Sequence, residues 1–136
     1  MLSLAIRGEN LASLGQPFTL DFEAEPLAGT GLFAITGETG SGKSTTLDAL
    51  CLALYGRYPR FAEQQVTPHP TPVAGCAFWT AARLRRGAGR GYAEANFLGQ
   101  DGQRYRARWE GRRSRNRADG VIQNATRSLH TINAEA

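Results

Sequence analysis

The sequence of 136 residues has a single lysine, only two cysteines and no long apolar run. Cys51 and Cys76 are too few for a disulfide framework, and neither lies in a Cys-x-x-Cys or Cys/His cluster, so we expect free thiols. Apolar runs stay far below the roughly 20 residues that a membrane helix needs, and the N-terminus lacks the features of a secretory signal. The sequence therefore predicts a cytoplasmic protein without a membrane partner.

Acidic residues are scarce in the second half of the chain, where the arginines gather. Residues 1–80 carry seven acids against four cations, whereas residues 81–136 carry twelve arginines against five acids. The net charge of +4 therefore comes from the second half. With 41% apolar and 21% charged residues, the composition is that of a globular domain with an ordinary core.

Residues 37–44 read Gly-Glu-Thr-Gly-Ser-Gly-Lys-Ser and match the phosphate-binding loop pattern G-x-x-x-x-G-K-[ST]. Glycines allow a tight coil whose amides converge on a phosphate oxygen, and the helix that follows adds the positive end of its dipole. Lys43, the only lysine, supplies charge for the β- and γ-phosphates, and the Ser44 hydroxyl can ligate magnesium. We therefore predict an ATP and magnesium site formed by Gly37, Glu38, Thr39, Gly40, Ser41, Gly42, Lys43, Ser44 and Thr45.

The spacing of apolar residues predicts the elements around this loop. Alternating apolar residues indicate strands near residues 2–6 and 18–22, whereas the unbroken run 32–35 indicates a central strand that is buried on both faces. Residues 43–55 have apolar side chains at helical spacing and predict a helix. Its predicted buried face consists of Leu47, Leu50, Cys51 and Leu54.

The middle of the chain is rich in proline. We predict that residues 57–90 are mainly connection, with a short helix near residues 79–86 as an alternative, and the role of the segment 64–83 stays open. This connection divides the chain into a first part with strands, loop and helix (1–56) and an arginine-rich part (91–136).

The arginine-rich part predicts a β-hairpin. Residues 92–98 and 103–110 flank a Gly-Gln-Asp-Gly turn, and a short strand is expected near residues 121–123. Alternating arginines on the second hairpin strand share one face, which is suited to DNA phosphates or is simply a solvated charged face. The candidate DNA contacts are Arg104, Arg106, Arg108, Arg113 and Arg115.

The residues around the loop resemble the N-terminal ATPase lobe of the SbcC exonuclease subunits, bacterial relatives of the SMC-like repair ATPases. The similarity lies in residues 31–36, in Leu47-Asp48-Ala49-Leu50 after the loop, and in the helix end Ala53-Leu54-Tyr55-Gly56. It implies an α/β fold, a P-loop NTPase of the ABC-ATPase-like N-terminal lobe type, with a mixed β-sheet, P-loop helix and β-hairpin.

The resemblance also implies that the adenine side of the nucleotide lies against the loop after the first strand. Asn10 and Ser13 are the candidate residues there. A role in capping the turn is the alternative for both side chains.

The same resemblance implies an ATPase that controls an associated nuclease in DNA double-strand-break repair and recombination. Its expected partners are a C-terminal ATPase lobe, a second head and an SbcD-like nuclease subunit. The sequence shows no Q-loop glutamine, signature motif or Walker B acids, so we expect residues 1–136 to form a partial lobe without a catalytic residue, inactive alone. The alternatives are a RecN-like repair ATPase lobe, a small P-loop kinase or an inactive remnant.

Overall fold

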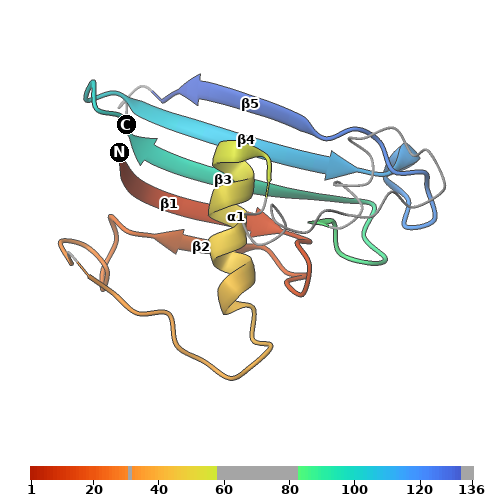
Figure 1. Cartoon of the computed structure of the whole chain (residues 1–136), viewed down its shortest axis with the longest axis horizontal. Coiled ribbons are helices and arrows are strands. Elements are labelled where there is room, and N and C mark those ends of the chain that lie inside the picture. The colour runs from red at the N-terminus through yellow and green to blue at the C-terminus, as the bar shows by residue number, and fades with distance from the viewer. Residues whose placement is uncertain (31, 58–82, 133–136) are drawn as a thin grey trace.

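A five-stranded antiparallel sheet with one helix across its face forms the body of the molecule (Figure 1). The computed structural model describes residues 1–30, 32–57 and 83–132. The strand order in the sheet is β2-β1-β3-β4-β5. The elements are β1 (Leu2–Glu9), β2 (Phe18–Asp21), α1 (Lys43–Tyr55), β3 (Arg90–Leu98), β4 (Arg104–Arg112), the 3-10 turn η2 (Ser114–Asn116) and β5 (Thr126–Thr131).

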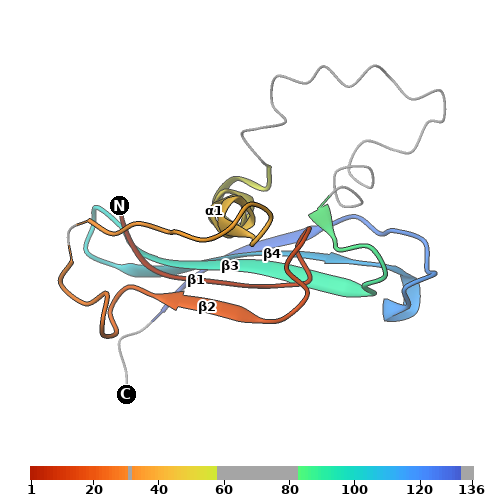
Figure 2. The same cartoon turned by 90° about the horizontal axis from the view of Figure 1, so that it is seen from below.

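The core lies between α1 and the middle strands of the sheet. Figure 2 shows α1 on one side of the sheet, and the helix contacts β1, β3 and β4. Ala93 and Ala95 on β3 are fully buried beneath it, and their small side chains let the helix approach the sheet closely. Trp109, paired across from Ala93 and only 1% exposed, is among the largest fully buried side chains of this core.

The predicted hairpin is confirmed. β3 and β4 pair antiparallel around the turn at residues 99–102, with Leu98 opposite Arg104. Backbone bonds from Gly99 to Gln103 and from Gly102 to Gly99 close the turn. The strand alternation is also as predicted, because Ala107 and Trp109 are buried against α1 while the arginines of β4 lie on the opposite face.

The predicted bounds of the helix are confirmed, but its predicted buried face is wrong. The residues of α1 that are buried are Thr45, Asp48, Ala49, Leu52 and Ala53. By contrast, Leu47 is 54% exposed, and Leu50, Cys51 and Leu54 are only half-buried. Both sides of this helix are apolar, so spacing alone did not reveal that the side with small alanines contacts the sheet.

The predicted central strand at residues 32–35 is also wrong. These residues form no strand, and Leu32 is 90%, Phe33 45% and Ile35 37% exposed. The segment runs outside the β2 edge toward the start of α1, as Figures 1 and 2 show. A strand needs a neighbour for its backbone bonds, and no described strand lies beside it. All pairings in the described sheet are antiparallel, whereas the sequence had predicted a mixed sheet.

The remaining differences lie in the arginine-rich part and the connection before it. The expected strand near residues 121–123 is only an isolated bridge between Arg113 and Ile122, and the fifth strand, β5, follows later in the chain. Of the predicted connection, residues 58–82 lie outside the described residues. Near its end, Leu84 is buried and forms a bridge with Leu11. Cys51 is a free thiol, whereas Cys76 falls in the range that is not described.

The described ranges also bear on membrane and metal binding. No helix in them is long and apolar enough to cross a membrane. Within the same ranges, no three His, Cys, Asp or Glu side chains gather as a metal-binding group.

Gly56, which ends α1, provides a test of the helix terminus. It has φ +68°, and its backbone amide donates to the Leu52 carbonyl. A Cβ there would lie 2.8 Å from Cδ of Arg127. Nη1 of Arg127 donates a hydrogen bond to the Tyr55 carbonyl. We expect Gly56→Ala to lower the free energy of unfolding by about 2 kcal/mol, from backbone strain and the displaced arginine.

The matched control is Gly102→Ala in the hairpin turn. Gly102 has φ +75° but nothing within 4 Å of an added Cβ, so only backbone strain is introduced. Urea titration of both variants should show the larger loss for Gly56→Ala. Equal losses would show that the Arg127 contact with the helix end contributes nothing.

Candidate nucleotide-binding site

The predicted phosphate-binding loop leads directly into α1. Gly42 is the residue before the helix and has φ +93°, a left-handed conformation that favours glycine. A Cβ at Gly42 would collide with the side chain of Leu14, which covers the loop from the β1–β2 connection. The first amides of α1 lack partners within the helix and so face the loop, together with the positive end of the helix dipole. This arrangement is suited to an anion.

Lys43 connects the two ends of the loop. Its Nζ donates to the carbonyls of Gly37, at 2.7 Å, and Glu38, at 2.5 Å, and lies 3.5 Å from Oγ of Ser41. The backbone amide of Ser41 in turn donates to the Glu38 carbonyl. Among the described residues, the ammonium group is held by neutral acceptors only, so a phosphate can take it without breaking an ion pair there.

The two residues after the lysine have different environments. Ser44 is exposed, and its hydroxyl is a hard oxygen ligand of the kind that magnesium takes alongside phosphates and water. Thr45 is buried, and its Oγ1 lies 3.2 Å from Oγ of Ser13. This hydrogen bond brings Ser13, a predicted adenine-side residue, to the first turn of α1.

Asn10, the other predicted adenine-side residue, is part of the turn after β1. Its φ of +53° is left-handed, which asparagine tolerates better than most residues. Its Nδ2 donates to the Arg90 carbonyl at the start of β3, at 3.0 Å. The side chain thus connects the end of β1 with the start of β3.

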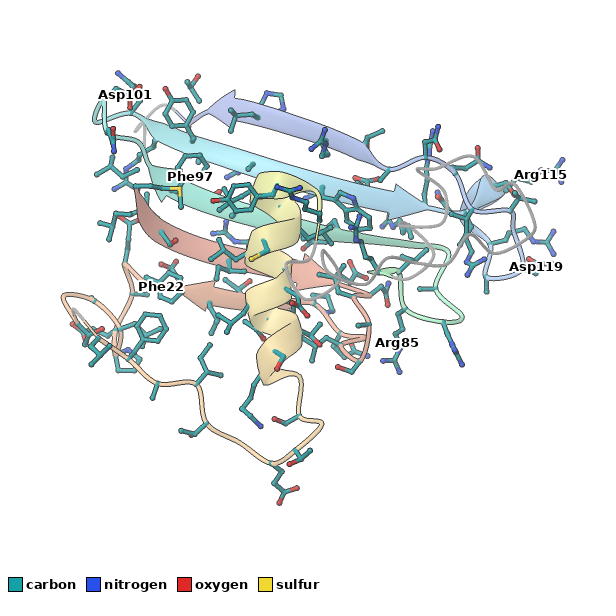
Figure 3. All side chains as sticks on the ribbon, in the orientation of Figure 1. Phe22, Arg85, Phe97, Asp101, Arg115 and Asp119 are labelled. Carbon is teal, nitrogen blue, oxygen red and sulfur yellow. The ribbon has the colours of Figure 1, made fainter. Side chains whose placement is uncertain are left out.

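Sequence reasoning missed a segment that lies beside this turn. The backbone of residues 83–85 pairs with it, since Ala12 donates to the Arg83 carbonyl and Arg85 donates to the Asn10 carbonyl. Nη1 of Arg85 donates to the Ser13 carbonyl at 2.6 Å, and Figure 3 shows Arg85 beside the turn. The hydrogen-bonded partners Arg85 and Ser13 lie about seventy residues apart in the sequence. The one local signal was an apolar residue between two arginines, Leu84, which is buried in the structure.

The sequence of the chain is similar to those of known proteins. The sequence model of the AAA domain family matches residues 5–135. The chain is 52% identical over 132 residues to the SbcC subunit of the nuclease SbcCD from Rhodobacter capsulatus, a match that covers 95% of the chain. It is 50% identical over 137 residues to the same protein of Pseudomonas aeruginosa, covering 99% of the chain. The match to the Bacillus subtilis protein is 51% over 61 residues, 45% of the chain.

These relatives confirm the resemblance predicted from the sequence. The chain spans 11% of the length of the first two relatives, and its shorter match covers 5% of the third. The similarity therefore concerns one part of much longer proteins.

Proposed function

Because the chain belongs to the AAA domain family, we propose that it binds ATP with magnesium through the loop 37–44 and Thr45. The observation that carries this proposal is the position of Lys43 at the N-terminus of α1, where its Nζ donates to the Gly37 and Glu38 carbonyls. When ATP enters, its phosphates take the loop amides and the Lys43 ammonium as donors. The Ser44 hydroxyl would help to hold magnesium, which would supply charge that neutralises the phosphates.

The turn after β1 is the proposed side for the base and ribose. Ser13 is held against α1 by Thr45, and the Arg85 guanidinium is held against the Ser13 carbonyl. Arg85 is exposed, so part of its guanidinium is open to a ligand. Asn10 contributes by holding the turn in shape.

The function proposed for the whole protein is that of an SbcC-like ATPase that controls a nuclease subunit in DNA repair. The names of the relatives support this over a RecN-like lobe or a small kinase. A role on bacterial DNA is in turn consistent with a cytoplasmic location. A second head and an SbcD-like nuclease subunit are the partners that such an assembly requires.

A C-terminal ATPase lobe is the proposed neighbour on the helix side. An apolar groove of about 710 Å³ lies between β1, α1 and the segment before the loop. A helix that is apolar on both sides is expected to be covered on both, and Leu47 of α1, which lines this groove, is 54% exposed. The groove is lined by Leu4, Phe22, Phe33, Ile35, Leu47 and Leu50. Strands of the second lobe would also supply neighbours for residues 32–35.

Hydrolysis requires groups that we assign to other parts of such an assembly. We expect the purified 136-residue chain to bind ATP and to hydrolyse it hardly at all, because no residue is assigned to orient the attacking water. Release of inorganic phosphate at saturating ATP and magnesium measures this. Clear turnover that disappears in Lys43→Ala would refute the partial-lobe account.

DNA contact through the arginines stays a second, separate proposal. Arg104 forms a bidentate ion pair with Glu23, in which Nη1 lies 2.8 Å from Oε2 and Nη2 lies 2.7 Å from Oε1. These hydrogen bonds hold the pKa of Glu23 below its usual value. Arg113 donates to the Gly120 carbonyl, whereas Arg115 is exposed on η2 (Figure 3). The five candidate arginines therefore differ in how free they are to bind phosphate.

A further inference from the structure

The face of the sheet opposite α1 carries a cluster of charged residues around Glu94 on β3. Nη1 of Arg108 lies 2.9 Å from Oε2 of Glu94, Nη1 of Arg7 lies 3.3 Å from Oε1, and Nε of Arg106 lies 3.5 Å from Oε1. Glu94 is only 7% exposed, although among the described residues no helix covers this face. We call these four residues the Glu94 cluster.

Two arginines of the Glu94 cluster differ in what their guanidinium groups can still bind. Arg108 donates from Nη1 to Glu94 and from Nη2 to Glu110, and its guanidinium carbon lies 4.0 Å from the centre of the Tyr92 ring. Both Nη groups and one face of the guanidinium plane are thus already engaged. Arg108 stabilises the sheet face and offers little to a ligand.

Arg106 is anchored at the base of its guanidinium and free at the tip. Nε donates to Oδ1 of Asn96 at 3.2 Å and lies next to Glu94. Neither Nη group has a hydrogen bond to a described residue, and the side chain is 43% exposed. A guanidinium fixed through Nε presents its two Nη groups as a planar fork, which matches two oxygens of a phosphate.

The sheet register adds a neighbour to this fork. Arg106 pairs with Asn96 on β3 and with His130 on β5, so the three side chains form one row across the open face. His130 is exposed. Glu94 lies in the adjacent row of that face and Glu110 one row further, whereas Asp21 stands at the far end of the Arg106 row, beyond Ala5.

We propose that Arg106 is a phosphate-contact residue for a nucleic-acid backbone and that Glu94 and Asn96 are the positioning residues that aim its fork. This inference rests on the proposed DNA contact and narrows it. Of the three candidate arginines on β4, Arg106 binds phosphate, whereas Arg104 and Arg108 are engaged within the protein. The ligand is a phosphodiester group of duplex DNA, read without regard to sequence.

The test uses fluorescence anisotropy of a labelled DNA duplex with the 136-residue chain over a series of salt concentrations. Arg106→Gln should weaken binding about tenfold at low salt and reduce the slope of log K against log salt by about 0.9, because one phosphate contact is lost. Arg108→Gln, the matched control, should leave this slope unchanged and lower the melting temperature instead.

Two further variants separate charge from geometry. Arg106→Lys keeps the charge but has no Nε anchor, so it should keep the salt slope and still weaken binding several-fold. Asn96→Ala should weaken binding with an unchanged slope, because it removes no charge and only releases the fork. Circular dichroism checks that each variant is folded.

The outcomes distinguish this inference from the proposals on which it rests. If the unaltered chain binds no duplex, the DNA proposal and this inference fail together, while ATP binding is tested separately. If it binds and Arg106→Gln changes neither affinity nor slope, or Arg108→Gln changes both equally, the assignment of Arg106 is wrong. If Arg106→Lys binds as the unaltered chain does, charge alone acts and the positioning role is wrong.

Discussion

Replacing Lys43 by alanine is expected to weaken ATP binding about 10- to 100-fold while leaving the fold intact. In the part of the chain that the structure describes, the side chain donates to loop acceptors and to no carboxylate, so its loss removes charge-assisted bonds to phosphate without breaking an ion pair. Ligand at 100 times its dissociation constant stabilises a protein by about 2.7 kcal/mol. ATP with magnesium should therefore raise the melting temperature of the unaltered chain by several degrees and that of Lys43→Ala by about half as much or less.

The melting temperature without nucleotide is the internal control for this experiment. It should be nearly the same for Lys43→Ala and the unaltered chain, because the described partners of the Lys43 ammonium all lie in the loop. A large drop would mean that Lys43 supports the fold, and an undiminished ATP shift in Lys43→Ala would mean that nucleotide binds elsewhere.

Replacing Trp109 by alanine should cause the largest loss of stability in the described part of the chain. Trp109 is 1% exposed and belongs to the cluster of Ile6, Leu52 and Ala93 between sheet and helix. Removing a buried tryptophan costs about 3–5 kcal/mol, from lost transfer free energy and the cavity left behind. The melting temperature should fall by about 10–20 °C, and urea titration measures the loss of free energy.

An exposed aromatic residue on the helix gives the comparison. Tyr55 is 59% exposed at the end of α1, so Tyr55→Ala should change the free energy of unfolding by less than about 0.5 kcal/mol. Trp109→Phe should fall between the two, because a smaller ring still fills part of the space. Similar effects of Trp109→Ala and Tyr55→Ala would contradict the placement of the core.

The parts of this fold that depend on local rules were predictable from the sequence. The loop pattern, the bounds of α1 and the hairpin turn each depend on residues within about a dozen positions of one another. The register of β3 and β4 followed from the turn, and it put Arg106 and Arg108 on one face and Trp109 on the other.

The parts that sequence reasoning missed depend on distant neighbours. The run 32–35 has the composition of a buried strand, but a strand forms only where another lies beside it. Arg85 reaches the turn at Ser13 through a pairing about seventy residues apart, which no local pattern encodes. The buried side of α1 was missed because both sides are apolar and only the close approach of the sheet decides between them.

The free ends of Arg106 illustrate the same limit. The sequence predicted a face of arginines and left DNA contact and simple solvation as alternatives. Only the positions of Glu94 and Asn96 distinguish an arginine that is engaged within the protein from one that is anchored and open.

The central claim, that the loop before α1 binds ATP, is tested most directly by amide chemical shifts. We expect titration of the ¹⁵N-labelled chain with magnesium and a non-hydrolysable ATP analogue to give saturable changes. The largest should fall on the amides of Gly40, Gly42, Lys43 and Ser44, with smaller ones at Ser13 and Arg85. Saturable changes centred elsewhere, or none at these amides at high concentrations of the analogue, would contradict the account.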